Sequence, residues 1–156
     1  MMRLLLGMVM TTCMAACQAQ PVVDASSDYA VMGLAEAAVH TPYLAKIQHV
    51  NVEIELAVDP KTQEEYARHV YIADVLTTYR GKHRATISYV VLTDKDDEAL
   101  IEQAPVIVAL CLDEFGQLYW PGTGSQFPVN SKTEMWLSNH QATTLQQQSE
   151  HSWCNK

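Results

Sequence analysis

Histidine is the residue type in this 156-residue chain that most readily supports metal binding or acid–base chemistry, because its unperturbed pKa lies near neutrality. The chain contains six: His40, His49, His69, His83, His140 and His151. They form neither an HxH nor an HExxH motif, and a zinc site needs three or four ligands in suitable geometry. We therefore interpret them as scattered structural residues, and we expect neither a metal site nor a cofactor.

Two further patterns that bear on catalysis are a glycine-rich stretch and a pair of carboxylates. Ser125 ends the stretch 122–125, which is not the G-x-S-x-G turn of a nucleophilic serine and lacks the lysine of a phosphate-binding loop. We interpret this stretch as a tight turn that needs glycine. Glu53 and Glu55 alternate in a predicted strand, so their carboxylates share one face and could form an acid–base pair. Such residues are more often the solvated face of a strand.

A cluster of basic residues interrupts an otherwise acidic chain with a net charge of −8. This acidity disfavours nucleic acid as a partner, because binding phosphates needs many lysines and arginines. The cluster comprises Arg80, Lys82, His83 and Arg84. Projecting from a hairpin, these side chains could bind an anionic partner such as a lipid headgroup or a glycan phosphate, or they could simply form a polar turn between hydrophobic strands. Trp120 could likewise expose its ring to a ligand or pack in the core.

The first 16 residues have the pattern of a secretory signal. Arg3 precedes a short apolar run over residues 4–10, and the small residue Ala16 comes directly before Cys17. The run is too short to span a bilayer, which needs about 20 residues. This arrangement resembles the lipobox of bacterial lipoproteins, which implies that Cys17 is lipidated and becomes the first residue of the mature chain. Gln18 replaces the aspartate that would imply retention at the inner membrane, so the resemblance favours the outer membrane.

Cysteine usage then predicts one disulfide. Removal of residues 1–16 leaves three cysteines, and lipidation of Cys17 leaves Cys111 and Cys154. An oxidising compartment favours a bond between these two, although two buried free thiols remain an alternative. The bond would stabilise the fold by roughly 3–4 kcal/mol in the chain-entropy model.

The remaining chain divides into a polar tether over residues 17–28 and a single domain over residues 29–156. Helical spacing of apolar residues predicts a helix over residues 28–39. Alternating or β-branched runs predict five strands. The first begins at residue 45, and in it Val50, Val52, Ile54 and Leu56 alternate with polar residues. The other four are residues 69–79, 85–92, 105–112 and 117–120. The run 105–112 lacks alternation, which predicts burial on both faces.

Residues 121–130 are predicted to be irregular, and Ser131 with Glu134 predicts the capping box of a final helix. Five consecutive strands with a helix at each end favour an α+β, mainly β fold. We expect a five-stranded, OB-like, partly open barrel with flanking N- and C-terminal helices.

Part of the chain, over roughly residues 45–130, resembles a known family. The segments that carry the resemblance are Val75–Lys82, Thr86–Val90, Pro105–Leu110, Tyr119 and Gly122–Val129. Their order is similar to that in bacterial relatives of the netrin-like and tissue-inhibitor-of-metalloproteinases domain, which implies an OB-like barrel and a binding role. The animal inhibitors chelate a protease zinc through a free N-terminal cysteine, whereas the comparable Cys17 would here be lipidated and separated from the barrel by the tether.

Together these patterns predict a non-enzymatic lipoprotein of the bacterial cell envelope that binds a protein or a glycan. We expect it to be anchored by lipid in the outer membrane and to face the periplasm. One alternative is an inhibitor of a protease or lysozyme. Another is an enzyme that acts on the cell wall through Glu53, Glu55 or a histidine.

Overall fold

The computed structural model describes residues 25–147 and 152–154. The predicted signal peptide, Cys17 and most of the tether lie outside the described residues. Among the described helices, none is long and apolar enough to cross a membrane. The elements in chain order are helix α1 (Ala25–His40), strands β1 (Tyr43–Val58), β2 (Glu65–Arg80), β3 (Thr86–Asp94), β4 (Val106–Leu112), β5 (Leu118–Tyr119) and β6 (Gln126–Pro128), helix α2 (Ser131–His140) and the 3-10 helix η1 (Thr144–Gln146).

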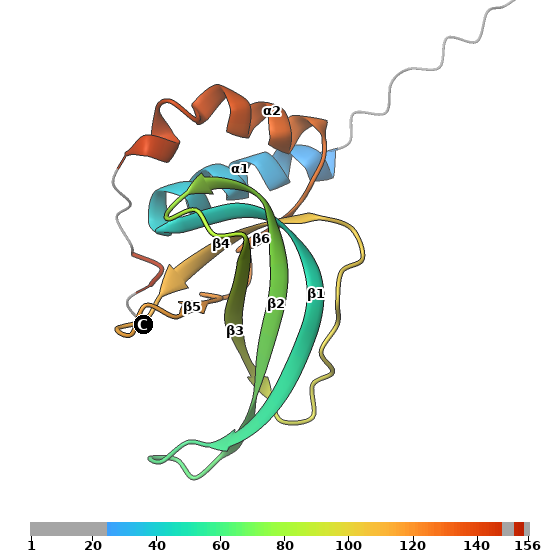
Figure 1. Ribbon diagram of the computed structural model, residues 1–156, viewed down its shortest axis with the longest axis vertical. Coiled ribbons are helices and arrows are strands. Elements are labelled where there is room, and N and C mark those ends of the chain that lie inside the picture. Colours follow the sequence, from blue (N-terminus) through green and yellow to red (C-terminus); the bar gives the residue numbers. More distant parts are fainter. Residues whose placement is uncertain (1–24, 148–151, 155–156) are drawn as a thin grey trace, which may run out of the picture.

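The described strands form one sheet in the order β1-β2-β3-β5-β4-β6, and a further pairing of β1 with β4 closes five of them into a ring. Neighbouring strands are antiparallel except β3 and β5. Two residue pairs join β5 to β3 and two join it to β4, so the ring is weakly closed on this side. The structure therefore confirms the predicted α+β, mainly β class, with an OB-like, partly open barrel flanked by helices (Figure 1).

Strands β1 and β2 curve strongly because their register shifts three times. Each shift leaves one strand with an extra residue, which bends the pair and increases its twist. Leu76 and Tyr79 are the extra residues of β2, and Val50 is the extra residue of β1. The bulge at Val50 keeps Val52 on the same face as His49, although the two residues are three positions apart in the sequence. This face lines the inside of the barrel and is called the inner face below.

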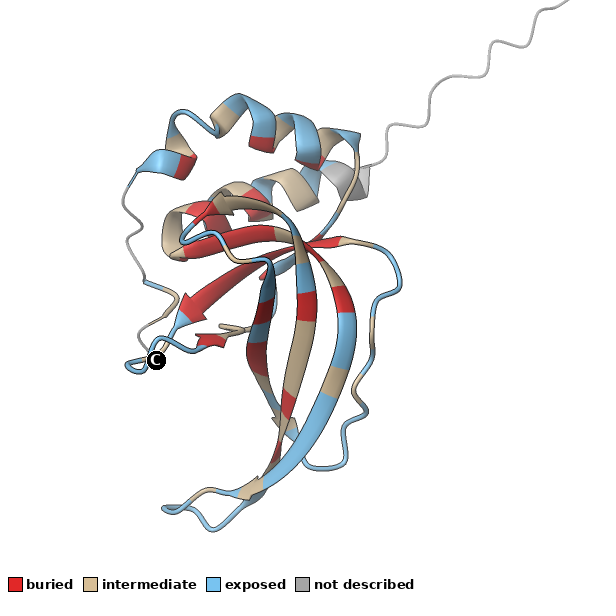
Figure 2. Ribbon diagram, viewed as in Figure 1, coloured by how far each residue is buried: buried red, intermediate tan, exposed pale blue. Residues whose placement is uncertain are grey.

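Beyond the bulge, the β1–β2 hairpin and the end of β3 extend past the barrel as an arm, defined here as residues 50–68 and 91–98 (Figure 1). The sequence correctly predicts strands here but suggests that β1 has one solvated face. The structure leaves much of the inner face exposed as well, since Ile54 is 54% and Leu56 is 72% exposed. The helices cover the opposite end of the molecule, so neither helix packs against the arm (Figure 2).

The core consists of two clusters that share β4. Inside the barrel, side chains of alternate residues such as Val108 pack with Ile47 and Leu118. On the other face of β4, Ile107 packs with Leu34 and other residues of the helical layer. Residues 106–111 are all buried, which confirms the prediction that this strand is covered on both faces (Figure 2).

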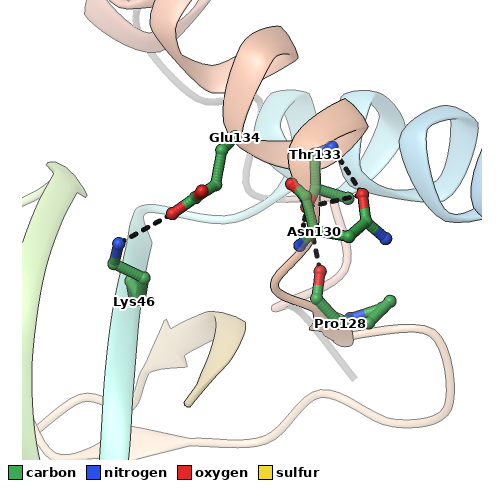
Figure 3. A network of polar contacts seen from close by, with 5 residues as sticks. All are labelled: Lys46, Pro128, Asn130, Thr133 and Glu134. Atoms are coloured by element: carbon green, nitrogen blue, oxygen red, sulfur yellow. Dashed lines mark hydrogen bonds and ion pairs between the residues drawn. The ribbon is translucent and has the colours of Figure 1, made fainter.

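The chain between β5 and α2 differs from the sequence prediction at two places. Residues 126–128, predicted to be irregular, form a short edge strand that pairs with β4. The capping box consists of Asn130 and Thr133, not Ser131 and Glu134. The Asn130 side chain accepts hydrogen bonds of 3.0 Å from the backbone N–H groups of Lys132 and Thr133, and Figure 3 shows the one from Thr133. Asparagine caps a helix as well as serine does.

Glu134 has a different role from the one predicted. Its carboxylate lies 2.8 Å from Nζ of Lys46 on β1 and so connects α2 to the barrel (Figure 3). This hydrogen bond raises the pKa of Lys46. Thr133, the third residue of the helix, completes the capping box because its hydroxyl accepts a 3.0 Å hydrogen bond from the backbone N–H of Asn130.

Candidate functional site

A cavity of about 230 Å³ lies on the inner face of the barrel, and we call it the aromatic cavity. Its walls include the rings of Tyr71, Tyr89, Trp120 and His49 and the polar side chains of Glu102 and Gln126. The strand register explains this grouping, because Tyr71 on β2 is directly opposite Tyr89 on β3. Residues opposite each other in adjacent strands point to the same face of the sheet.

The aromatic side chains of the cavity are held by direct contacts. The rings of Tyr71 and Tyr89 stack with centroids 5.4 Å apart and planes 15° apart. His49 packs against Tyr71 at a centroid distance of 5.3 Å, and its Nε2 lies 2.7 Å from the Tyr89 hydroxyl. His49 is 7% exposed and Tyr89 is 3% exposed, so this hydrogen bond is shielded from water. These contacts therefore hold the aromatic side chains of the wall in place without a ligand.

His49 leaves one nitrogen without a partner. Its Nδ1 is buried and makes no hydrogen bond within the described residues. Burial lowers the pKa of His49, and the carboxylate of Glu102 partly opposes this shift. Burial also raises the pKa of Tyr89, so its hydroxyl keeps its proton. A neutral imidazole bonded at Nε2 thus keeps Nδ1 as a buried polar atom without a hydrogen-bond partner among the described residues.

The segment between β3 and β4 forms one side of the cavity. Leu100 and Glu102 contribute lining side chains from this segment. The side-chain amide of Gln48 on β1 donates a 2.8 Å hydrogen bond to the carbonyl oxygen of Gln103, which attaches the segment to the barrel. Leu100 is nevertheless 76% exposed, so this side of the cavity opens to solvent.

Of the predicted basic cluster, the structure separates Arg80 from the other members. Arg80 is 8% exposed and donates hydrogen bonds to the carbonyl oxygens of Thr41, Thr144 and Leu145. Its guanidinium therefore joins the end of α1 to η1. Lys82 and His83 lie exposed in the β2–β3 turn beside the half-buried Arg84, and a 3.3 Å hydrogen bond joins Nδ1 of His83 to the Thr78 hydroxyl.

The other predicted site residues are distributed over the barrel. Trp120 is half-buried, packs against the barrel core and contributes to the aromatic cavity. Glu55 lies on the outer face of the arm, where it pairs with Arg68 at 2.7 Å, and Glu53 shares that face. Within the described part of the chain, no group of three or more histidine, cysteine or acidic residues could hold a metal ion.

The two predicted disulfide partners are joined in the structure. Cys111 on β4 and Cys154 near the C-terminus form a disulfide with their Cα atoms 5.3 Å apart. The Tyr119 hydroxyl donates a hydrogen bond to the carbonyl oxygen of Cys154. The neighbouring Trp153 packs against the core cluster of the helical layer. The disulfide thus fixes the end of the chain against the barrel.

The sequence interpretation missed His49, Tyr71 and Tyr89 as a group. The signal is present in the sequence as one histidine and two tyrosines at inward positions of three predicted strands. Placing them together requires the register between the three strands, which alternation does not reveal.

Comparisons of the chain with protein-family models, with curated proteins and with solved structures found no match. The fold and the cavity define a small OB-like barrel with an aromatic cavity on its inner face.

Proposed function

We propose that this protein is a lipid-anchored, non-enzymatic binding module of the bacterial envelope and that the aromatic cavity receives one ring of a neutral glycan. The observation that carries the proposal is the combination of aromatic rings with the polar side chains of Glu102 and Gln126 around one small cavity. Aromatic faces pack against the C–H faces of a sugar ring. The carboxylate of Glu102 and the side-chain amide of Gln126 can then bond its hydroxyls, as polar groups orient ligands in other pockets.

The size of the cavity favours a single ring. Pockets for drug-sized ligands hold roughly 300–1,000 Å³, whereas this cavity holds about 230 Å³. Its opening beside Leu100 would let the rest of a longer glycan continue into solvent. A terminal or branching sugar of an envelope glycan fits these limits.

The charges around the cavity favour a neutral ligand. Glu102 is the charged side chain of the lining, and His49 is neutral because burial lowers its pKa. An anionic sugar would meet a carboxylate without a cation to offset it. Among the described residues, the lining contains one carboxylate, that of Glu102. This favours binding over cleavage, because glycoside hydrolysis ordinarily uses two carboxylates on either side of the scissile bond.

Titration of the purified protein with neutral sugars tests this proposal. Hexoses and short oligomers of N-acetylglucosamine should change the fluorescence of Trp120 on binding, and the sugars should be recovered intact. Trp120→Ala and Tyr71→Ala should weaken binding at least tenfold, because each removes a ring face. Phe115→Ala is the matched control, since this ring is 88% exposed and lies in the β4–β5 turn, outside the cavity lining.

Two results would contradict the proposal. Binding that survives both ring removals would place the ligand elsewhere on the molecule. Cleavage of the oligomers by the wild-type protein would replace a binding role with a catalytic one.

A further inference from the structure

The outer half of β1 is a free sheet edge. Strand β4 pairs with β1 at Tyr43–Ile47, whereas β2 pairs with it along its whole length. In the described part of the chain, no backbone hydrogen bond joins residues 50–58 of β1 to any segment other than β2. Nine residues at about 3.3 Å each give an edge roughly 30 Å long. Such an edge presents unpaired N–H and C=O groups to another strand.

The side chains of this edge disfavour an acidic strand but not a basic one. Natural edges are commonly protected by lysine or proline, and residues 50–58 contain neither. Ile54, Leu56 and Val58 on the inner face are each more than half exposed. Glu53 and Glu55 lie on the outer face, so the edge is apolar on one side and acidic on the other.

The arm that carries this edge is strongly acidic. It holds half of the 18 acidic residues of the chain and three basic residues. The acidic residues are Glu53, Glu55, Asp59, Glu64, Glu65, Asp94, Asp96, Asp97 and Glu98. Two of the three basic residues are already in ion pairs, Arg68 with Glu55 and Lys95 with Glu65. The arm therefore attracts a positively charged partner.

A second copy of the chain would meet like charges in the pairing register centred on Ile54. Antiparallel pairing of two copies centred on Ile54 would place Glu53 of one copy opposite Glu55 of the other, on the same face. Like charges directly opposite each other destabilise a sheet. The acidic residues thus act against self-pairing in this register while leaving the edge open to a strand of opposite charge.

We propose that residues 50–58 of β1 dock an extended, basic segment of another protein by adding it to the sheet as a further strand. Because side chains alternate between faces, the docked segment would place apolar residues beside Ile54 and Leu56 and lysine or arginine beside Glu53 and Glu55. This site is separate from the aromatic cavity, and the two proposals can fail independently.

The probe for this proposal is a capped seven-residue peptide of alternating lysine and valine. The purified full chain should bind it, and backbone amides within residues 50–58 should exchange hydrogen more slowly in the complex. A glutamate–valine peptide should bind at least tenfold more weakly because its charge repels the arm. A lysine–valine peptide with alternate N-methyl groups should lose binding to the same extent because it cannot form the strand hydrogen bonds.

Glu53→Lys is the informative variant, because Glu53 lies at the edge and the salt bridge of the neighbouring Glu55 stays intact. It should weaken binding of the lysine–valine peptide by roughly threefold to tenfold, the effect of one reversed cross-strand pair. Glu36→Lys makes the same charge change on the exposed side of α1 and should leave binding unaltered. Equal thermal unfolding midpoints would show that both variants fold.

Four outcomes would overturn the proposal. The first is no binding of the lysine–valine peptide. The second is equal binding of the N-methylated peptide, which would indicate charge attraction without strand addition. The third is equal weakening by Glu36→Lys and Glu53→Lys. The fourth is a dimer in sedimentation whose amides 50–58 are protected, which would make a second copy the occupant.

Discussion

At the scale of single residues, His49 connects the aromatic cavity to the stability of the barrel. It is buried, neutral and bonded through Nε2 to Tyr89. Because burial lowers its pKa, the folded protein resists protonation of this ring more than the unfolded chain does. The packing of the aromatic cavity and the pH dependence of folding therefore depend on the same side chain.

The free energy of unfolding should decrease as the pH falls below about 6.5, the ordinary histidine pKa. In that range the unfolded chain binds a proton at this position and the folded protein does not, so acid favours unfolding. The decrease should end once the pH passes below the lowered pKa of His49. Urea unfolding at several pH values between 5 and 8 measures the slope.

Replacement of His49 provides the control for this pH effect. His49→Phe should flatten the slope, because phenylalanine fills similar space and does not titrate. His83→Gln changes an exposed histidine of the β2–β3 turn and should leave most of the slope in place. A slope unchanged in His49→Phe would assign the pH dependence to other groups.

Arg80 should stabilise the fold and contribute nothing to ligand binding. Arg80→Met removes three hydrogen bonds to carbonyl oxygens that link α1 to η1. We expect a loss of about 2–4 kcal/mol in urea unfolding, because buried acceptors lose a charged donor. Lys82→Met, two residues along and exposed, should change stability by about 0.5 kcal/mol or less. Equal effects of the two changes would contradict the structural role of Arg80.

At the scale of elements, the sequence predicts most strands because their composition and period are local properties. Residues 105–112 form a continuous apolar run, and the structure buries residues 106–111 of it on both faces. Val52, Ile54 and Leu56 do alternate as predicted, but alternation cannot tell whether anything packs against the apolar side. Here the strand extends past the barrel, so the period is right and the burial is wrong.

Features that depend on distant partners could not be predicted in this way. The extra residue at Val50 is defined by the register with β2, and β6 is a strand because β4 lies beside it. Asn130 and Ser131 are almost equally good helix caps, so sequence preference alone could not choose between them. The aromatic cavity combines these problems, because its residues come from four strands and two loops.

The disulfide between Cys111 and Cys154 should contribute roughly 3–4 kcal/mol to stability, because it closes a long loop in the unfolded chain. Cys154→Ser should lower the urea midpoint accordingly, and reduction of the wild-type protein should have the same effect. Alkylation under denaturing, non-reducing conditions followed by mass spectrometry measures the pairing directly. Modification of both cysteines without a reductant would show that they are free thiols.

At the scale of the whole molecule, the helices and the arm lie at opposite ends of the long axis (Figure 1). Helix α1 follows the proposed tether, so an anchor at Cys17 would attach the protein by its helical end. The acidic arm lies at the other end, and the aromatic cavity lies on the barrel between them. Both proposed binding sites would then be reachable from the periplasm while the protein stays attached to a membrane.

The choice of Cys17 over Cys13 as the lipidated residue is the prediction on which this orientation depends. Small residues precede Cys17, whereas Thr12 precedes Cys13. Cys17→Ser should therefore move the protein from the membrane fraction to the soluble fraction, and Cys13→Ser should leave it in the membrane. Acyl chains account for this difference, because each buried CH₂ contributes about 0.8 kcal/mol to membrane binding. Mass spectrometry of the mature N-terminus should find the lipid on Cys17, and an unmodified Cys17 in the membrane fraction would require a different anchor.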